Sequence, residues 1–297
     1  MDISGLQAFV SVAENASFSA AADALHLTQP AVSKRIASLE NELNNRLFDR
    51  IGRQIQLTEA GQALLPRAQN IINEVQDSQR AISNLSTHIV GQLRIGTSHH
   101  IGLHRLPPVL RNYNQSFPDV ELDMQFLDSE QACKAVLHGE LELGIVTLPP
   151  DNSDPLTLIP LWNDPLHVVA SGEHPLATEK NIKLHSLANH PAVLPARGTF
   201  TREVIEDMLP EDVELKVRLS TNYLETIRMM VEIGLGWSVL PETMIQPELG
   251  LCPIKIKGVH LSRQLGIVYH TERTLSNAAQ AMCDLLLKMA DREQTIK

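Results

Sequence analysis

Residues 27–36 read LTQPAVSKRI and have the features of a helix start. Thr28 is a residue type that caps helix N-termini, and Pro30 falls in the first turn, where a missing N–H costs little. Further along, apolar residues recur at helical spacing and predict a buried face formed by Val32, Ile36, Leu39 and Leu43. The opposite face is polar, with Gln29, Ser33, Lys34 and Ser38. Such side chains can reach base edges or phosphates from a DNA major groove.

Two shorter helices are expected before this one, and a hairpin after it. Residues 3–14 carry apolar side chains on one helical face, and residues 19–25 form an alanine-rich helix that permits close packing. Ser17 or Ser19 is expected to cap the second helix. Across a turn at residues 26–28, the second and third helices form a helix-turn-helix. Residues 47–57 alternate apolar and polar positions, which predicts a β-hairpin wing.

The overall charge argues against nucleic acid, but the local charge does not. The formal net charge at pH 7 is −10, whereas nucleic-acid-binding proteins usually show a basic footprint. Between residues 34 and 53, the basic residues Lys34, Arg35, Arg46, Arg50 and Arg53 outnumber the acidic residues Glu40, Glu42 and Asp49. Because one chain then offers few phosphate contacts, specific DNA binding requires a dimer or a larger oligomer.

Residues 59–90 predict one long helix, with Pro66 in its first two to three turns as the single interruption. Small and apolar residues step along it by alternating four and three positions, a period of about 3.5 residues that is typical of a coiled-coil seam. The stripe comprises Leu57, Gly61, Leu64, Ala68, Ile71, Val75, Ser78, Ile82, Leu85 and Ile89. Since it is too long to bury against the small N-terminal domain, we expect it to pair with a second chain.

After Gly91, short strands alternate with helices. The strand segments QLRIGT, VELDMQF, LELGIVT, LHVVAS and QLGIVYH surround helical stretches such as residues 106–113 and 130–138. This alternation predicts an α/β domain with a mostly parallel sheet and ligand sites at the carboxyl ends of the strands.

The block from Ala8 to Gly61 resembles the DNA-binding domain of LysR-type transcriptional regulators. The alanine-rich second helix, the TQPAVS start of the third, the later Leu47-Phe48 and Arg50, and the Leu57-Thr58 exit match in order and spacing. The resemblance implies a winged helix-turn-helix at residues 1–58, a linker and dimerisation helix at 59–90, and an effector domain at 91–297. The effector domain would resemble type 2 periplasmic binding proteins, with subdomain I at about 91–162 and 267–297 and subdomain II at about 163–266.

The same resemblance implies roles and partners. Gln29, Pro30, Ser33 and Lys34, after the cap at Thr28, would enter the major groove, Arg50 and Arg53 would lie near phosphate or the minor groove, and Ser17 and Ser19 would contact the DNA backbone. Implied partners are double-stranded promoter DNA, RNA polymerase and further copies of the chain, as a homodimer through the linker helix and a homotetramer. A small effector in the cleft between the subdomains would control the output.

Several hydroxyl groups stand where strands end and helices begin, and in this architecture they would face the cleft. The first segment supplies Thr97, Ser98, His99 and His100, and others supply Ser129, Thr147, Thr199 and Thr201. Hydroxyls and backbone N–H groups at helix starts favour an anion, so we expect a carboxylate or an inorganic oxyanion and no other cofactor. For each residue, ordinary helix capping remains an equal alternative, and each histidine is as well explained by packing.

A metal-sensing regulator is the main alternative. His99, His100 and His104 lie close in sequence, and His100 and His104, four residues apart, share a helix face. No carboxylate or cysteine next to them in sequence completes the ligand set, so we predict no metal ligand.

Other functional classes find little support. Cys133, Cys252 and Cys283 are widely spaced, which argues against a disulfide framework, a zinc site or a peroxide-sensing pair. Neither G-x-S-x-G, H-E-x-x-H nor a P-loop is present, so an enzyme is not expected. The start MDIS does not resemble a signal peptide, and no apolar run is long enough to cross a bilayer, so we expect a cytoplasmic protein that does not act at a membrane.

Overall fold

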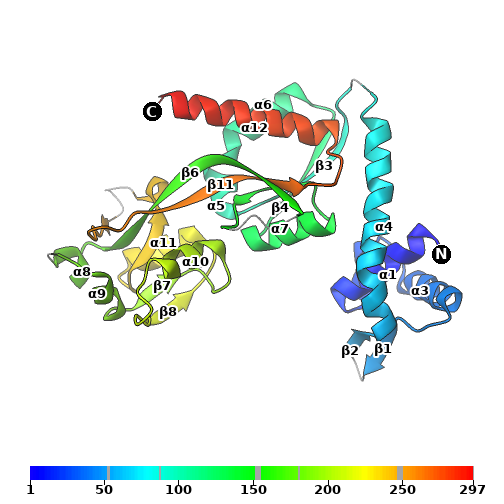
Figure 1. Cartoon of the computed structure of the whole chain (residues 1–297), viewed down its shortest axis with the longest axis horizontal. Coiled ribbons are helices and arrows are strands. Elements are labelled where there is room, and N and C mark those ends of the chain that lie inside the picture. The colour runs from blue at the N-terminus through cyan, green and yellow to red at the C-terminus, as the bar shows by residue number, and fades with distance from the viewer. Residues whose placement is uncertain (52–53, 87, 151–154, 180, 246–249, 297) are drawn as a thin grey trace. The chain divides into compact units, whose positions relative to one another are not determined.

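The computed structural model of the protein describes residues 1–51, 54–86, 88–150, 155–179, 181–245 and 250–296. The chain forms two compact units, residues 1–86 and 87–297 (Figure 1). Within the described ranges, no helix has both the length and the apolar character that crossing a membrane requires.

The first unit is built on three helices, α1 (Ile3–Asn15), α2 (Phe18–Ala24) and α3 (Gln29–Leu43). Their buried faces meet in one core that includes Leu6, Phe9, Val32, Ile36 and Leu39. Ser17, not Ser19, caps α2, because the Ser17 hydroxyl accepts from the Ala20 N–H at 3.2 Å. Thr28 occupies the N-cap position of α3, but its side chain makes no capping hydrogen bond.

The wing is an antiparallel pair, β1 (Phe48–Ile51) and β2 (Gln54–Leu57). Helix α3 positions it, since the Glu40 carboxylate accepts from the Leu47 N–H at 2.7 Å. Where the wing leads into the next helix, the Thr58 hydroxyl donates to the Arg46 carbonyl at 2.7 Å and accepts from the Gly61 N–H at 3.0 Å. A Cβ atom on Gly61 would lie 2.3 Å from the Leu47 carbonyl oxygen, so only glycine permits this close approach.

Helix α4 (Glu59–Ser83) continues through Pro66 without a break. It differs from the predicted linker helix in two respects. It ends at Ser83, so the predicted heptad positions Leu85 and Ile89 lie beyond it. In addition, Ala68 is buried and Leu64 and Ile71 are partly buried against the core of their own unit, so the first half of the stripe packs within the chain. A 3.5-residue period occurs both where a helix packs against its own chain and where it packs against a second chain. The period alone therefore does not tell which of the two contacts a residue makes.

The second unit contains a sheet with the strand order β10–β6–β11–β5–β3–β4, and β9 also pairs with β6. Its main strands are β3 (Gly91–Thr97), β4 (Val120–Phe126), β5 (Leu143–Thr147), β6 (Leu156–Ser171) and β11 (Leu261–His270). The expectation of a mostly parallel sheet is wrong. Among the described strands of this sheet, β3 pairs parallel with β4 and with β5, whereas β6 and β11 are long strands that pair antiparallel to each other and to their neighbours.

Strands β6 and β11 run side by side through the unit and connect two lobes, each with its own core (Figure 1). Lobe I comprises β3, β4, β5, α5 (His99–His104), α6 (Leu106–Ser116), α7 (Ser129–His138) and α12 (Asn277–Ile296). Lobe II comprises α8 (Pro175–Thr178), α9 (Leu184–Ala188), β7 (Ala192–Leu194), α10 (Phe200–Asp207), β8 (Val217–Ser220), α11 (Leu224–Glu232), β9 (Ser238–Pro241), η1 (Glu242–Met244) and β10 (Leu251–Pro253). Trp162 belongs to the core of lobe I and Leu166 to that of lobe II, so the chain passes between lobes near Asp164.

Candidate functional site

The first candidate surface is the N-terminal part of α3. Thr28, Gln29, Pro30 and Lys34 are exposed and Ser33 is partly buried. The Gln29 side-chain amide donates to the Ser33 hydroxyl at 3.0 Å, so these two polar groups form one continuous edge. Ser19 is exposed, whereas the hydroxyl of Ser17 is engaged in its cap. The contact of these residues with DNA stays a prediction.

The wing residues can be placed only in part. Arg50 lies in β1 opposite Ile55. Its side chain and the whole of Arg53 lie outside the described residues.

The second candidate surface is a cavity between the two lobes, with a volume of about 50 Å³. It is lined by Ser98, His99, His100, Asp128, Ser129, Glu130, Thr147, Pro195, Thr199, Thr201, Asn222, Leu224 and Arg263. The structure therefore brings together all the predicted effector residues except Thr97. Thr97 is fully buried and its hydroxyl donates to the Ile145 carbonyl at 2.7 Å, so it supports the sheet and does not line the cavity. An effector role for the lining residues stays a prediction.

The lining hydroxyls also serve as local structural groups. Ser98 caps α5 and Thr199 caps α10, where the Thr199 hydroxyl accepts from the Arg202 N–H at 3.3 Å. The Ser129 hydroxyl accepts from the Thr147 N–H at 3.1 Å, which joins α7 to the end of β5. Capping and cavity lining are thus compatible for Ser98 and Ser129, because a hydroxyl that accepts from the backbone can still donate to a ligand. The Thr199 hydroxyl already donates to the Ala196 carbonyl at 2.9 Å.

A buried ion pair stands where β6 and β11 pass between the lobes. The Arg263 side chain donates from Nε to the fully buried Asp164 carboxylate at 2.9 Å, and from a terminal nitrogen to the Thr201 hydroxyl at 2.7 Å. Arg105 approaches the other Asp164 oxygen at 3.8 Å. Two guanidinium groups therefore share one carboxylate. The sequence pattern did not single out any of these three charged residues, since β-sheet register alone brings Asp164 opposite Arg263.

Two acidic side chains of lobe I accept hydrogen bonds from lobe II across the cavity. The Asn222 amide donates to the Asp128 carboxylate at 2.7 Å, and the Phe200 N–H donates to the Glu130 carboxylate at 2.6 Å. Burial raises the pKa of Glu130, although its hydrogen bond from Phe200 opposes this shift. Both acidic groups are engaged in bonds between lobes, which limits their repulsion of an anion.

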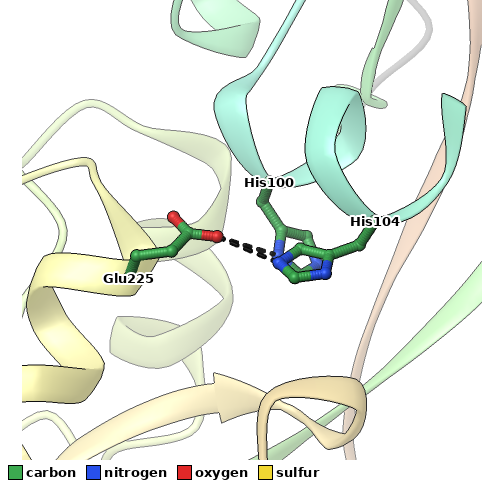
Figure 2. Close-up of side chains that lie close together, drawn as sticks. All are labelled: His100, His104 and Glu225. Carbon is green, nitrogen blue, oxygen red and sulfur yellow. Dashed lines mark hydrogen bonds and ion pairs between the residues drawn. The ribbon is translucent and has the colours of Figure 1, made fainter. Parts of the chain in front are cut away.

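The histidines separate into two environments. The His99 ring stacks on Phe126 with centroids 5.1 Å apart and meets the edge of Tyr223 at 4.9 Å. His100 is only 3% exposed, and burial lowers its pKa to about 3, so it is neutral at pH 7. His100 and His104 project from α5 toward Glu225 of α11 (Figure 2). The metal-sensing alternative grouped His99 with His100 and His104. In the structure the third residue of this group is Glu225 and not His99.

Removing the Arg263 charge is expected to destabilise the second unit strongly. Arg263→Leu leaves the buried Asp164 carboxylate without its main partner, which should cost about 3–5 kcal/mol of unfolding free energy. Urea unfolding of the full chain followed by tryptophan fluorescence measures this loss selectively, because Trp162 and Trp237, the two tryptophans of the sequence, both lie in the second unit. Arg228→Leu is the matched control, since its helical pair with Glu232 is more exposed and should contribute about 1 kcal/mol or less. Equal losses for the two variants would show that the Asp164–Arg263 pair has no special role.

The cysteines do not form a redox pair. All three are free, and burial raises the pKa of Cys133 and of Cys283 to about 12, which keeps both thiols protonated at neutral pH. Because the thiolate is the reactive form, neither is poised for oxidation.

A larger cavity of about 740 Å³ lies in lobe II, beside β6 and β10. Much of its lining is aliphatic, for example Leu166, Ile254 and Leu261. We place the candidate effector site in the smaller cavity, because there polar groups from both lobes converge.

Comparison with known proteins agrees with this arrangement. Residues 3–62 match the bacterial regulatory helix-turn-helix protein, lysR family, and residues 86–291 match the LysR substrate binding domain. The chain is 32% identical over 285 residues to the "Probable RuBisCO transcriptional regulator" of Synechocystis sp., covering 93% of this chain and 83% of that protein.

Solved structures share the fold. A full-length OxyR variant from Pseudomonas aeruginosa has a TM-score of 0.72 at 23% identity, covering 96% of this chain and 94% of that chain. Full-length CbnR in complex with its target DNA has a TM-score of 0.61 at 21% identity, covering 98% and 100%. These likenesses confirm the predicted fold class, an N-terminal helix-turn-helix followed by a C-terminal α/β effector domain. Because one profile covers well over half of its residues and a relative above 30% identity spans most of its length, the chain belongs to the LysR family of bacterial helix-turn-helix transcriptional regulators, and is not an enzyme.

Proposed function

We propose that a small anion, held in the cavity between the lobes, controls the DNA binding of this regulator. The observation that carries the proposal is the Arg263 guanidinium, which lines the cavity together with hydroxyls of both lobes. An arginine side chain carries several N–H donors. Among the described residues, those of Arg263 are bonded only to Asp164 and Thr201, so donors remain for a bound anion. The guanidinium group also supplies positive charge, which attracts an anion.

The size of the cavity favours a small ligand. A volume of about 50 Å³ is far below the roughly 300–1,000 Å³ of typical drug-sized ligand sites. In this conformation the cavity accommodates an inorganic oxyanion or a short carboxylate, while a larger effector requires the lobes to separate. Ser98 and Ser129 belong to lobe I and Thr201 to lobe II, and the Thr201 hydroxyl, which accepts from Arg263, can still donate to an anion. An anion bound by all three hydroxyls stabilises one relative position of the lobes and thereby shifts the population of conformations.

The DNA-bound form is a symmetric oligomer in this proposal. Ile82, near the end of α4, and Leu85, just beyond it, are 70% and 84% exposed, so an apolar surface is available for a second chain. A dimer through this surface presents two α3 helices to a dyad-symmetric operator, and a tetramer presents two such pairs. Movement of the lobes then changes the spacing of these helices and the bend of the bound promoter, where the regulator meets RNA polymerase.

The anion proposal predicts a ligand-dependent gain in thermal stability. We would screen the full chain against inorganic oxyanions and short carboxylates. A ligand present at about 100 times its Kd adds roughly 2.7 kcal/mol, which raises Tm by about 5–10 °C for a unit of this size. Ser98→Ala should remove most of this shift, whereas Ser116→Ala, at an exposed position on α6, should keep it. If no anion raises Tm, or if Ser98→Ala responds as the wild type does, the proposed site is wrong.

A further inference from the structure

His100, His104 and Glu225 form a cluster that connects the two lobes. The histidines come from α5 of lobe I and the glutamate from α11 of lobe II (Figure 2). Glu225 Oε1 lies 3.1 Å from His104 Nε2 and 3.9 Å from His100 Nδ1. One donor atom from each residue lies within 4.8 Å of the other two. The three side chains thus face one point, although Glu225 is more than 120 residues distant in sequence from either histidine.

His100 is the unusual member of this cluster. Its side chain is 97% buried, and neither ring nitrogen has a hydrogen-bond partner among the residues that the structure describes. Buried polar atoms are normally satisfied, so each exception in a folded protein requires an explanation. The hydrogen bond between His104 and Glu225 gives a polar group of each of those residues a partner, but it leaves the ring nitrogens of His100 without one. An ion bound between the three side chains engages all three residues and gives one ring nitrogen of His100 a partner.

The donor set fits a borderline transition-metal ion. Two imidazoles and one carboxylate, with a fourth position open, is a common ligand set for Zn²⁺, whereas Mg²⁺ and Ca²⁺ prefer oxygen donors throughout. Bond lengths near 2.0–2.2 Å in tetrahedral geometry place donors about 3.3 Å apart. The His104–Glu225 separation is already close to this, and the His100–Glu225 separation of 3.9 Å requires a small contraction. The two imidazole donors, which lie within 4.8 Å of each other, require the largest approach.

The surrounding charge is compatible with a cation. Arg105 and Arg263 both influence His100 electrostatically, and alone they would repel a metal ion. Both also approach the buried Asp164 carboxylate, which offsets part of their charge. Glu225 supplies a further negative charge at the site itself.

We propose that His100, His104 and Glu225 bind one divalent transition-metal ion of the Zn²⁺ type and that the ion joins lobe I to lobe II. This site shares His100 with the lining of the anion cavity, but metal binding here does not require the anion-binding function proposed above. Its effect would be to hold α5 and α11 together, so that metal availability becomes a second input to the position of the lobes.

Metal binding by the full, untagged chain tests the proposal directly. After dialysis against a chelator, the protein would be titrated with Zn²⁺ by calorimetry and with Co²⁺ by visible absorption, without added anion. We expect one ion per chain and the intense Co²⁺ absorption bands of a tetrahedral site. The absence of stoichiometric binding, or a Co²⁺ spectrum like that of the hydrated ion, would overturn the proposal.

Variants identify the ligands. His104→Ala and Glu225→Gln, both at partly exposed positions, should each weaken Zn²⁺ binding by more than about 100-fold, because loss of a residue that merely orients a ligand already costs about 10- to 100-fold. His100 is left intact, since its burial makes misfolding a rival explanation. His185→Ala is the matched control: His185 also faces a carboxylate, Asp212 at 3.3 Å, in an exposed pair. Unchanged affinity in both test variants, or an equal loss in the control, would refute the assigned ligands.

Discussion

A chain carrying Ile82→Asp and Leu85→Asp is expected to be monomeric and to lose most of its affinity for operator DNA. Both side chains are highly exposed, so the substitutions should leave the fold of either unit intact. A charge at each position opposes burial against a second chain. Without the second half-site, the avidity that links two recognition helices is lost, which is a factor of about 100 to 10,000. Light scattering measures the oligomeric state, and fluorescence anisotropy measures DNA affinity.

Ile82 and Leu85 are suitable positions for this test because they are exposed in the structure. Ile71 belongs to the same predicted stripe, but it packs against the core of its own unit, so Ile71→Asp would destabilise the DNA-binding domain itself. Gln79→Asp is the control, because it adds a single negative charge at another exposed position of α4, as each substitution of the double variant does. A double variant that remains dimeric would show that the exposed end of α4 is not the interface.

The second large effect is expected at α3. Ser33→Ala combined with Lys34→Ala should lower operator affinity at least about 30-fold, because each specific base contact contributes roughly 1–3 kcal/mol and a dimer carries every contact twice. Dimerisation should not change, since both residues are remote in sequence from the proposed interface. The loss should be smaller on random DNA, where phosphate contacts dominate.

Asn41→Ala is a suitable control for this variant. Asn41 is exposed on the last turn of the same helix, beyond the predicted recognition edge. Binding curves that coincide for the double variant and the wild type would exclude the N-terminal part of α3 as the recognition surface.

Local sequence patterns predicted the first unit well. The helical spacing of Val32, Ile36 and Leu39 identified a face that is buried in the structure. The periodicity failed at α4, because the same spacing serves for packing within a chain and between chains. It also failed for the sheet direction, since the antiparallel pairing of β6 with β11 joins segments about a hundred residues apart.

The residues of the candidate cavity also divide into those predictable from local sequence and those that depend on contacts distant in sequence. Ser98, Ser129 and Thr199 were recognised because a hydroxyl between a strand and a helix is a local signal. Arg263 and Glu225 were missed, because each acquires its role from a partner distant in sequence, Asp164 and His104 respectively. A strand arginine or a helix glutamate has no distinguishing local context, so tertiary structure is needed to find it.

We expect this acidic chain to bind promoter DNA specifically through a local basic surface. The most direct measurement is fluorescence anisotropy of the full chain with DNA from its own upstream region and with random DNA, at several salt concentrations. We expect the upstream fragment to bind at least about 1,000-fold more tightly than random DNA, with affinities that fall steeply as salt rises. Equal affinity for the two DNAs, or no salt-dependent binding to either, would show that the chain does not bind its promoter specifically through basic residues.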